Sequence, residues 1–136
     1  MLAFGTDQPN SEKPLPPGAE YVCRPPQSQL KEIYAGCDAW LFGSRLDSFG
    51  LPILEAMACR TPVIAVPIGA AQDLLGDGTG VLVAKESPEE MAAAVVALCR
   101  QSESDWLAAS LRAHRKAHGY SWDDAATRLL ATLEQA

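Results

Sequence analysis

The sequence lacks any long apolar run, although 48% of its 136 residues are hydrophobic. A helix that crosses a membrane needs roughly 18 to 20 consecutive apolar residues, and no stretch approaches that length. The start of the chain, MLAFGTDQPN, also lacks the basic region and apolar segment of a signal peptide. We therefore expect no transmembrane segment and a cytoplasmic location.

Clustered basic residues are absent as well. The 11 Lys and Arg residues are scattered among 17 Asp and Glu, which gives a formal net charge of −6. Nucleic-acid binding draws most of its affinity from grouped Lys and Arg that neutralise phosphates, so we expect no nucleic-acid partner. A small anion remains compatible with this charge, because a helix N-terminus and one or two Arg can bind phosphate.

Paired metal-ligand motifs are missing too. The widely spaced cysteines form no C-x-x-C pair: Cys23, Cys37, Cys59 and Cys99. Buried free thiols in a reducing compartment are favoured over a disulfide framework or a zinc site. His114 and His118 stand four residues apart, but with no third ligand nearby they indicate the basic end of a helix. We expect no bound metal.

What the chain does contain is an alternation of short apolar runs and helical patterns. Brief apolar or β-branched runs bounded by turn residues predict strands at 2–5, 20–23, 39–42, 62–66 and 80–83. Helical patterns lie between the later strands, at 27–36, 51–59 and 70–76. This alternation predicts a single α/β domain over residues 1–136, with a parallel sheet covered on both faces. Residues 6–18, TDQPNSEKPLPPG, form a Pro-rich loop or linker where a crossover helix would be expected.

The last third of the chain is entirely helical in pattern, over 87–100, 102–118 and 120–136. Ser87 with Glu90, and Ser121 with Asp124, have the spacing of capping boxes. The first of these helices carries an apolar stripe of Met91, Val95 and Leu98. The third carries another, of Trp122, Ala126, Leu129, Leu130 and Leu133. Each of these two helices therefore has an apolar face, and that of the third helix is a candidate docking surface.

The stretch DSFGLPILEAMACRTPVIA, which begins at Asp47, contains the best candidate for chemistry. In a doubly wound sheet, ligands bind where strands end and loops open into helices. Gly50 allows the backbone to approach a ligand closely, and Pro52 suits the first turn of a helix. The free N–H groups of this turn are then available to an anion. Glu55 is expected in the first turn, where its ionised carboxylate could accept hydrogen bonds from two adjacent hydroxyls.

This stretch resembles the acidic-x7-acidic motif of retaining glycosyltransferases with the GT-B fold, especially family 4. Three further segments are similar to that family: IYAGCDAWLFGS to the preceding helix and strand, PIGAAQDLLGDGTGVLV to its Gly-Gly-x-x-Glu segment, and YSWDDAATRLLATL to its terminal helix. The resemblance covers the chain from about Glu20 to its end. It implies a Rossmann-like parallel sheet, the C-terminal domain of a GT-B enzyme without its first strand and helix, followed by a helical tail.

The resemblance also implies roles for individual residues. Asp47 would face the transferred sugar as the catalytic acidic residue, and Glu55 would hold the ribose hydroxyls of the donor. The remaining implied donor-site positions are the backbone of Phe49, Gly50 and Leu51, the loop residues Ser44 and Gly69, and Arg24 near the base. Such enzymes transfer a hexose by front-face displacement with retention, and no cofactor or obligatory metal is expected.

Some positions depart from the family pattern. Asp47 is one methylene shorter than the usual Glu, and Arg60 stands where Gly is favoured after the helix. Ala70 and Asp73 replace the second Gly and the Glu of the Gly-Gly-x-x-Glu segment. These substitutions could change the reach to the sugar and the shape of the turns.

Family members also carry a preceding acceptor domain and a central first strand that have no counterpart here. The strands on either side of that strand must pair with each other, borrow one from a partner, or leave edges exposed, and exposed edges could join copies of the chain. The resemblance implies the donor-binding half of a retaining glycosyltransferase that is inactive alone and needs an acceptor domain or partner chain. The alternatives are the donor-binding subunit of a split transferase and a non-catalytic α/β interaction module.

Overall fold

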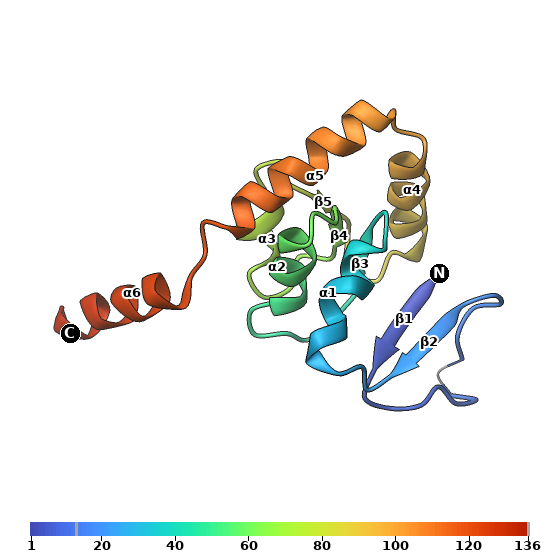
Figure 1. Ribbon diagram of the computed structural model, residues 1–136, viewed down its shortest axis with the longest axis horizontal. Helices are drawn as coiled ribbons and strands as arrows, with labels where there is room; N and C mark the ends of the chain where they lie inside the picture. The colour runs from blue at the N-terminus through green and yellow to red at the C-terminus, as the bar shows by residue number, and fades with distance from the viewer. Residues whose placement is uncertain (13, 136) are drawn as a thin grey trace.

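A computed structural model describes residues 1–12 and 14–135. Over these residues the chain is an α/β protein with parallel strand pairs, as the sequence predicts (Figure 1). The strands are β1 (Leu2–Gly5), β2 (Glu20–Cys23), β3 (Trp40–Phe42), β4 (Val63–Ala65) and β5 (Val81–Leu82). The helices are α1 (Gln27–Ala35), α2 (Leu51–Ala58), α3 (Ala71–Leu75), α4 (Pro88–Cys99), α5 (Glu103–Ala117) and α6 (Trp122–Glu134). Each expected strand and helix is present; β1 and β2 have the expected bounds, and the ends of the other elements differ by at most two residues.

The strands form two separate sheets. One pairs β1 with β2, and the other has the order β3-β4-β5. Within the described residues, therefore, β1 and β3 do not pair with each other, and each keeps one edge without a strand. Of the three outcomes that the sequence left open, pairing between these two strands does not occur in the described chain. Residues 6–12 and 14–19 connect β1 to β2 without a helix or strand, as expected of a loop.

Aromatic side chains connect the two sheets. Phe4 of β1 stacks on Trp40 of β3, with ring centroids 5.3 Å apart and an interplanar angle of 30°. Tyr34, near the end of α1, lies edge-on to both rings. The indole Nε1 of Trp40 is buried and has no hydrogen-bond partner within the part of the chain that the structure describes. Side-chain packing therefore takes the place of backbone pairing at this junction.

The main core lies between α2, α5 and the β3-β4-β5 sheet. Ile53 and Met57 of α2 are completely buried, as is Leu74 of α3. Helix α5 crosses α2, and the Ser110 hydroxyl donates to the carbonyl of Arg60 at 2.7 Å (Figure 1). Arg60, which stands where the family favours Gly, has a left-handed φ of 66°, so the substitution does not remove this turn. A residue with a side chain therefore occupies a conformation that favours glycine.

Helix α4 covers the other part of the larger sheet. Leu98 is buried with Val66 and Val83, and the rest of the predicted stripe, Met91 and Val95, packs against this cluster. Ser87 caps α4 by accepting a hydrogen bond from the Glu90 amide. The reciprocal half of the predicted capping box is wrong, because the Glu90 carboxylate accepts from the amide of Ala84 instead, at 2.8 Å. Glu86, the residue before the cap, has a φ of 56° and turns the chain there. This turn brings the amide of Ala84 within reach of the Glu90 carboxylate.

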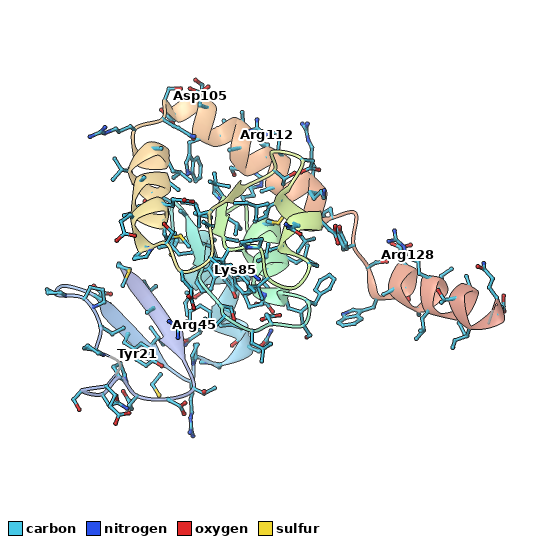
Figure 2. The ribbon with its side chains drawn as sticks, turned by 180° about the vertical axis from the view of Figure 1, so that it is seen from behind. Tyr21, Arg45, Lys85, Asp105, Arg112 and Arg128 are labelled. Atoms are coloured by element: carbon cyan, nitrogen blue, oxygen red, sulfur yellow. The ribbon has the colours of Figure 1, made fainter. Side chains whose placement is uncertain are left out.

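Helix α6 projects away from the rest of the molecule (Figure 1). None of its residues is buried, so its apolar stripe is not part of the core of the described chain. Trp122 is 81% exposed, and Leu129, Leu130 and Leu133 are between 60% and 63% exposed. Ser121 caps the start of this helix as predicted, because its hydroxyl accepts a hydrogen bond from the Asp124 amide at 3.1 Å. Figure 2 shows Arg128 on this helix, far from the body of the protein.

The cysteines and the helix lengths can be compared with the sequence predictions. The cysteines are free, but Cys99 is exposed and the other three are partly buried, so the prediction of buried thiols is wrong for Cys99. Cys99 is the last residue of α4, where the helix ends at the surface. Among the helices that the structure describes, none is long and apolar enough to cross a membrane.

Candidate functional site

The junction between β3 and α2 contains the acidic segment found in the sequence. Gly50 precedes the helix with a φ of 90°, a left-handed conformation that a residue with a side chain would adopt with strain. Pro52 lies in the first turn, as expected. Asp47 Oδ1 accepts hydrogen bonds from the amides of Phe49 at 3.0 Å and Gly50 at 2.5 Å. Two of the N–H groups expected to be free for an anion are therefore bonded to the chain's own carboxylate.

This self-contact follows from the length of the Asp side chain. Asp readily bonds to backbone N–H groups two or three residues further along the chain, because its carboxylate lies close to its own backbone. The substitution of Asp for the Glu usual at this position therefore matters locally. It gives the loop an internal hydrogen-bond acceptor, and any anion that uses these amides must displace it.

Glu55 is the fifth residue of α2, so the prediction that it lies in the first turn is wrong. The helix begins at Leu51, after Gly50 has turned the chain. The Glu55 side chain is partly buried, and its Oε2 accepts a hydrogen bond from the Tyr34 hydroxyl at 2.8 Å. Burial raises the pKa of Tyr34, and the hydrogen bond to Glu55 raises it further. Tyr34 therefore stays protonated and acts as a donor.

Gly69 is brought against the same loop. It has a φ of 58°, and a Cβ atom there would lie 3.1 Å from the carbonyl carbon and oxygen of Phe49 and 3.2 Å from the carbonyl of Asp47. The amide of Ala70 donates to the Phe49 carbonyl at 3.0 Å. The loops after β3 and β4 are thus in direct backbone contact, and the small size of Gly69 permits that contact.

Two cavities border the β3–α2 loop. One, of about 570 Å³, is lined by Ser44 and Arg45 together with Lys85 and Glu86 after β5. The Ser44 hydroxyl donates to the carbonyl of Leu46 at 2.9 Å, and Arg45 forms an exposed ion pair with Glu86 at 3.7 Å. Figure 2 labels both cations, Arg45 and Lys85, near the centre of the molecule. This cavity offers two positive charges and hydroxyl groups beside the candidate site.

The second cavity is about 420 Å³ and mostly apolar. Phe49 and Leu51 line it from either side of the start of α2, Tyr120 lines it from the segment before α6, and Trp122 lines it from the first residue of α6. Neither cavity is lined by Asp47, Gly50 or Glu55. These three candidate residues therefore lie in or next to the β3–α2 loop, but they do not line a single preformed cavity.

Arg24 lies at the end of the smaller sheet. Its backbone φ is 49°, its amide donates to the Gly5 carbonyl at 2.7 Å, and its guanidinium Nε donates to the Thr6 carbonyl at 2.9 Å. These contacts tie the end of β2 to the end of β1. In the described chain, the hydrogen bonds and ion pairs of Arg24 include none to the loop of Asp47 or to Glu55.

Tyr34 is the residue that sequence reasoning missed. Its position on α1 indicates an ordinary core residue, and its ring is indeed 1% exposed. The signal that could have identified it is the phenol itself, because a buried Tyr hydroxyl usually needs a partner. That partner, Glu55, lies 21 residues further along the chain.

No group of three or more His, Cys, Asp or Glu side chains in residues 1–12 and 14–135 is arranged to hold a metal ion. His114 and His118 have ring centroids 4.3 Å apart, and His114 Nδ1 lies 2.9 Å from the carbonyl of Ala58. His114 therefore contacts the end of α2.

The sequence profile of the glycosyl transferases group 1 family matches residues 12–122. The chain belongs to this family. D-inositol 3-phosphate glycosyltransferase of Actinosynnema mirum is 38% identical over 117 residues, a match that covers 82% of this chain and 27% of that protein. The protein of the same name from Mycobacterium avium is 36% identical over 115 residues, with the same two coverages. This group 1 chain thus spans about a quarter of the length of these relatives.

Solved structures agree with this fold. Anabaena HepE in complex with UDP-glucose has a TM-score of 0.75 and 22% identity, covering 93% of this chain and 35% of that one. Sucrose-phosphate synthase from Thermosynechococcus elongatus has a TM-score of 0.74 and 23% identity, covering 92% and 30% respectively. The group 1 chain therefore has the fold of one domain of these GT-B glycosyltransferases.

Proposed function

We propose that this chain is the nucleotide-sugar-binding half of a retaining glycosyltransferase that moves a hexose from a nucleoside-diphosphate sugar to an acceptor. The observation that carries the proposal is the contact between the loops after β3 and β4, where Gly69 packs against the backbone of Asp47 and Phe49. This contact gathers the acidic segment and the glycine loop at the carboxyl ends of parallel strands, where α/β folds bind ligands. Membership of the group 1 family and UDP-glucose bound to HepE, a protein of the same fold, support it.

In this proposal each acidic residue has a separate role. Glu55 holds the ribose hydroxyls, because a carboxylate accepts hydrogen bonds from adjacent hydroxyls. Asp47 faces the transferred sugar once the diphosphate has taken its place on the amides of Phe49 and Gly50. Leu51, Ser44 and Gly69 contribute further donor contacts.

Arg24 contacts the base in the same scheme, after releasing its hydrogen bond to Thr6. Positioning and stabilisation of the leaving diphosphate supply most of the rate, with retention at the sugar and without an obligatory metal. Hexose specificity and a cytoplasmic location are parts of this proposal.

The chain needs an acceptor-binding domain to complete the reaction, and alone it is inactive. The exposed stripe on α6 favours one form of this requirement, in which the chain is the donor-binding subunit of a split transferase and α6 docks on the acceptor-binding partner. The unpaired edges of β1 and β3 offer a second contact, through which copies of the chain could associate.

Thermal unfolding with and without nucleoside diphosphates tests the proposal. UDP, GDP and ADP are added at millimolar concentration, and one of them should raise the unfolding temperature. A ligand at 100 times its dissociation constant adds about 2.7 kcal/mol to the free energy of unfolding. The Glu55→Ala variant should lose most of the rise.

The matched control is Glu103→Ala, which removes an exposed carboxylate at the start of α5. It should keep the full response to the nucleotide. Unfolding temperatures that stay unchanged with all three nucleotides, or an equal response in Glu55→Ala, would contradict the proposed function.

A further inference from the structure

Tyr34 is held rigidly from several sides. Its ring is 1% exposed and lies edge-on to Phe4, with centroids 5.7 Å apart, and to Trp40, with centroids 4.8 Å apart. Its backbone carbonyl accepts a hydrogen bond from the buried Thr61 hydroxyl at 2.7 Å. Contacts from β1, β3 and the segment before β4 therefore fix the ring, and with it the position of the phenol oxygen.

Glu55 receives that fixed hydroxyl on one oxygen. The distance from Tyr34 Oη to Glu55 Oε2 is 2.8 Å. Among the residues that the structure describes, Oε1 has neither a hydrogen bond nor an ion pair. A Glu side chain has three rotatable bonds, and a bond to a fixed donor selects one of its rotamers. The carboxylate is thus anchored through Oε2, while Oε1 remains able to accept a further hydrogen bond.

We propose that Tyr34 is the positioning residue of the donor site: its hydroxyl holds Oε2 of Glu55 so that Oε1 accepts a hydrogen bond from a ribose hydroxyl of a nucleoside diphosphate. This rests on the proposed function, because it assigns Glu55 to the ribose. The raised pKa of Tyr34 agrees with a permanent donor. Preorganised polar groups bind more tightly because less conformational freedom is lost on binding.

The competing explanation is that Glu55 satisfies a buried phenol and contributes only to folding. The two explanations differ in their dependence on the ribose. A folding role lowers the affinity for every nucleotide equally or not at all, whereas a positioning role acts only on ligands with ribose hydroxyls. The experiment must therefore compare ligands as well as variants.

Calorimetric titration uses the full chain and the best-bound of UDP, GDP and ADP, together with its 2′,3′-dideoxy analogue. Tyr34→Phe should weaken binding of the ribose nucleotide about two- to tenfold, the range expected for losing one hydrogen bond. The affinity of Tyr34→Phe for the dideoxy analogue should equal that of the unaltered chain. The control variant is Tyr21→Phe. It removes a hydroxyl that donates to the Asp7 carbonyl in the β1–β2 region, and it should bind both ligands as tightly as the unaltered chain does.

A double-mutant cycle tests whether Tyr34 acts through Glu55. In a Glu55→Ala background, adding Tyr34→Phe should produce no further loss of affinity, because the positioned carboxylate is already gone. Equal losses in both backgrounds, or equal losses for both ligands, would overturn the positioning role while leaving the proposed function intact. Failure of the unaltered chain to bind any of the three nucleotides would instead overturn the proposed function, and this inference with it.

A measurement on the unaltered side chain covers the case in which Tyr34→Phe does not fold. In protein labelled at tyrosine ¹³Cζ, the resonance that moves in Glu55→Ala identifies Tyr34. That resonance should shift when the ribose nucleotide is added and stay in place with the dideoxy analogue. A resonance that responds equally to both ligands, or to neither while the nucleotide binds, rules out the positioning role.

Discussion

Helices α2 and α6 are both rich in apolar residues, but their surroundings are opposite. In α2, Ile53, Ala56 and Met57 are completely buried, although no side chain caps the start of the helix. In α6, a Ser cap is present and acidic residues occupy the first turn, yet no residue is buried. The comparison indicates that α2 depends on packing, whereas α6 depends on local signals. An isolated helix of about 12 to 15 residues is marginally stable in water, so α6 should be the weaker of the two.

Truncating an apolar side chain in each helix should give the largest contrast. Met57→Ala removes a fully buried side chain and should lower the free energy of unfolding by about 2 to 5 kcal/mol. Leu130→Ala removes a side chain that is 60% exposed and should change it by no more than about 0.5 kcal/mol. Urea unfolding monitored by circular dichroism measures both. Similar losses in the two variants would mean that α6 is packed in solution.

Removing the N-cap hydroxyls should sharpen the contrast at a smaller scale. Ser87→Ala uncaps α4, which packs on the larger sheet, and should lower global stability by about 1 kcal/mol. Ser121→Ala uncaps α6 and should reduce helical content at low temperature without moving the main unfolding midpoint. Circular dichroism during cooling and during urea unfolding separates the two effects. A shift of the main midpoint by Ser121→Ala would show that α6 unfolds together with the core.

The smallest expected effect is that of an exposed ion pair near the end of α5. Lys116 of α5 forms an ion pair with Asp77 at 2.6 Å, and hydrogen bonds from Lys116 and Thr79 lower the pKa of Asp77 from 3.8 to about 2. A carboxyl whose pKa is lower in the folded state contributes stability above its unfolded value, and this contribution is lost as the pH falls. The unaltered chain should therefore exceed Asp77→Asn in stability above about pH 4, and the difference should vanish near pH 2.

Urea midpoints measured between pH 2 and pH 6 test this dependence. The helical content of α6 should be equal in the two proteins, because the ion pair joins α5 to the loop before β5. A stability difference that persists unchanged at pH 2 would contradict the role of the charged carboxylate.

The sequence predicts the elements well because their signals are local. The spacing of apolar residues, the turn residues and the caps predicted the position of every strand and helix. Ser87 and Ser121 cap the helices that they were expected to cap. Burial of α6 could not be predicted in this way, because an apolar stripe indicates a face without identifying the surface that covers it. The two separate sheets likewise depend on which strands lie next to each other, which no single segment encodes.

The candidate site is predicted less completely, for a related reason. Motif positions identify the segment from Asp47 to Glu55 and the Gly69 loop, whereas the backbone contact between them is seen only in the fold. The Asp47 hydrogen bonds depend on a difference of one methylene, whose effect became clear only with the path of the loop. The Tyr34–Glu55 bond joins two helices and required the fold itself.

The division of the strands has a mechanical consequence. Hydrogen-bonded ladders make a sheet stiff, and here the ladder is interrupted between β1 and β3, where the rings of Phe4 and Trp40 meet instead. A pair of strands by itself is marginally stable, so the β1–β2 unit can open without breaking a backbone hydrogen bond of the larger sheet. Amide protons of β1 and β2 should accordingly exchange with solvent ahead of those in β4, so that one chain combines a soft pair of strands with a stiffer sheet.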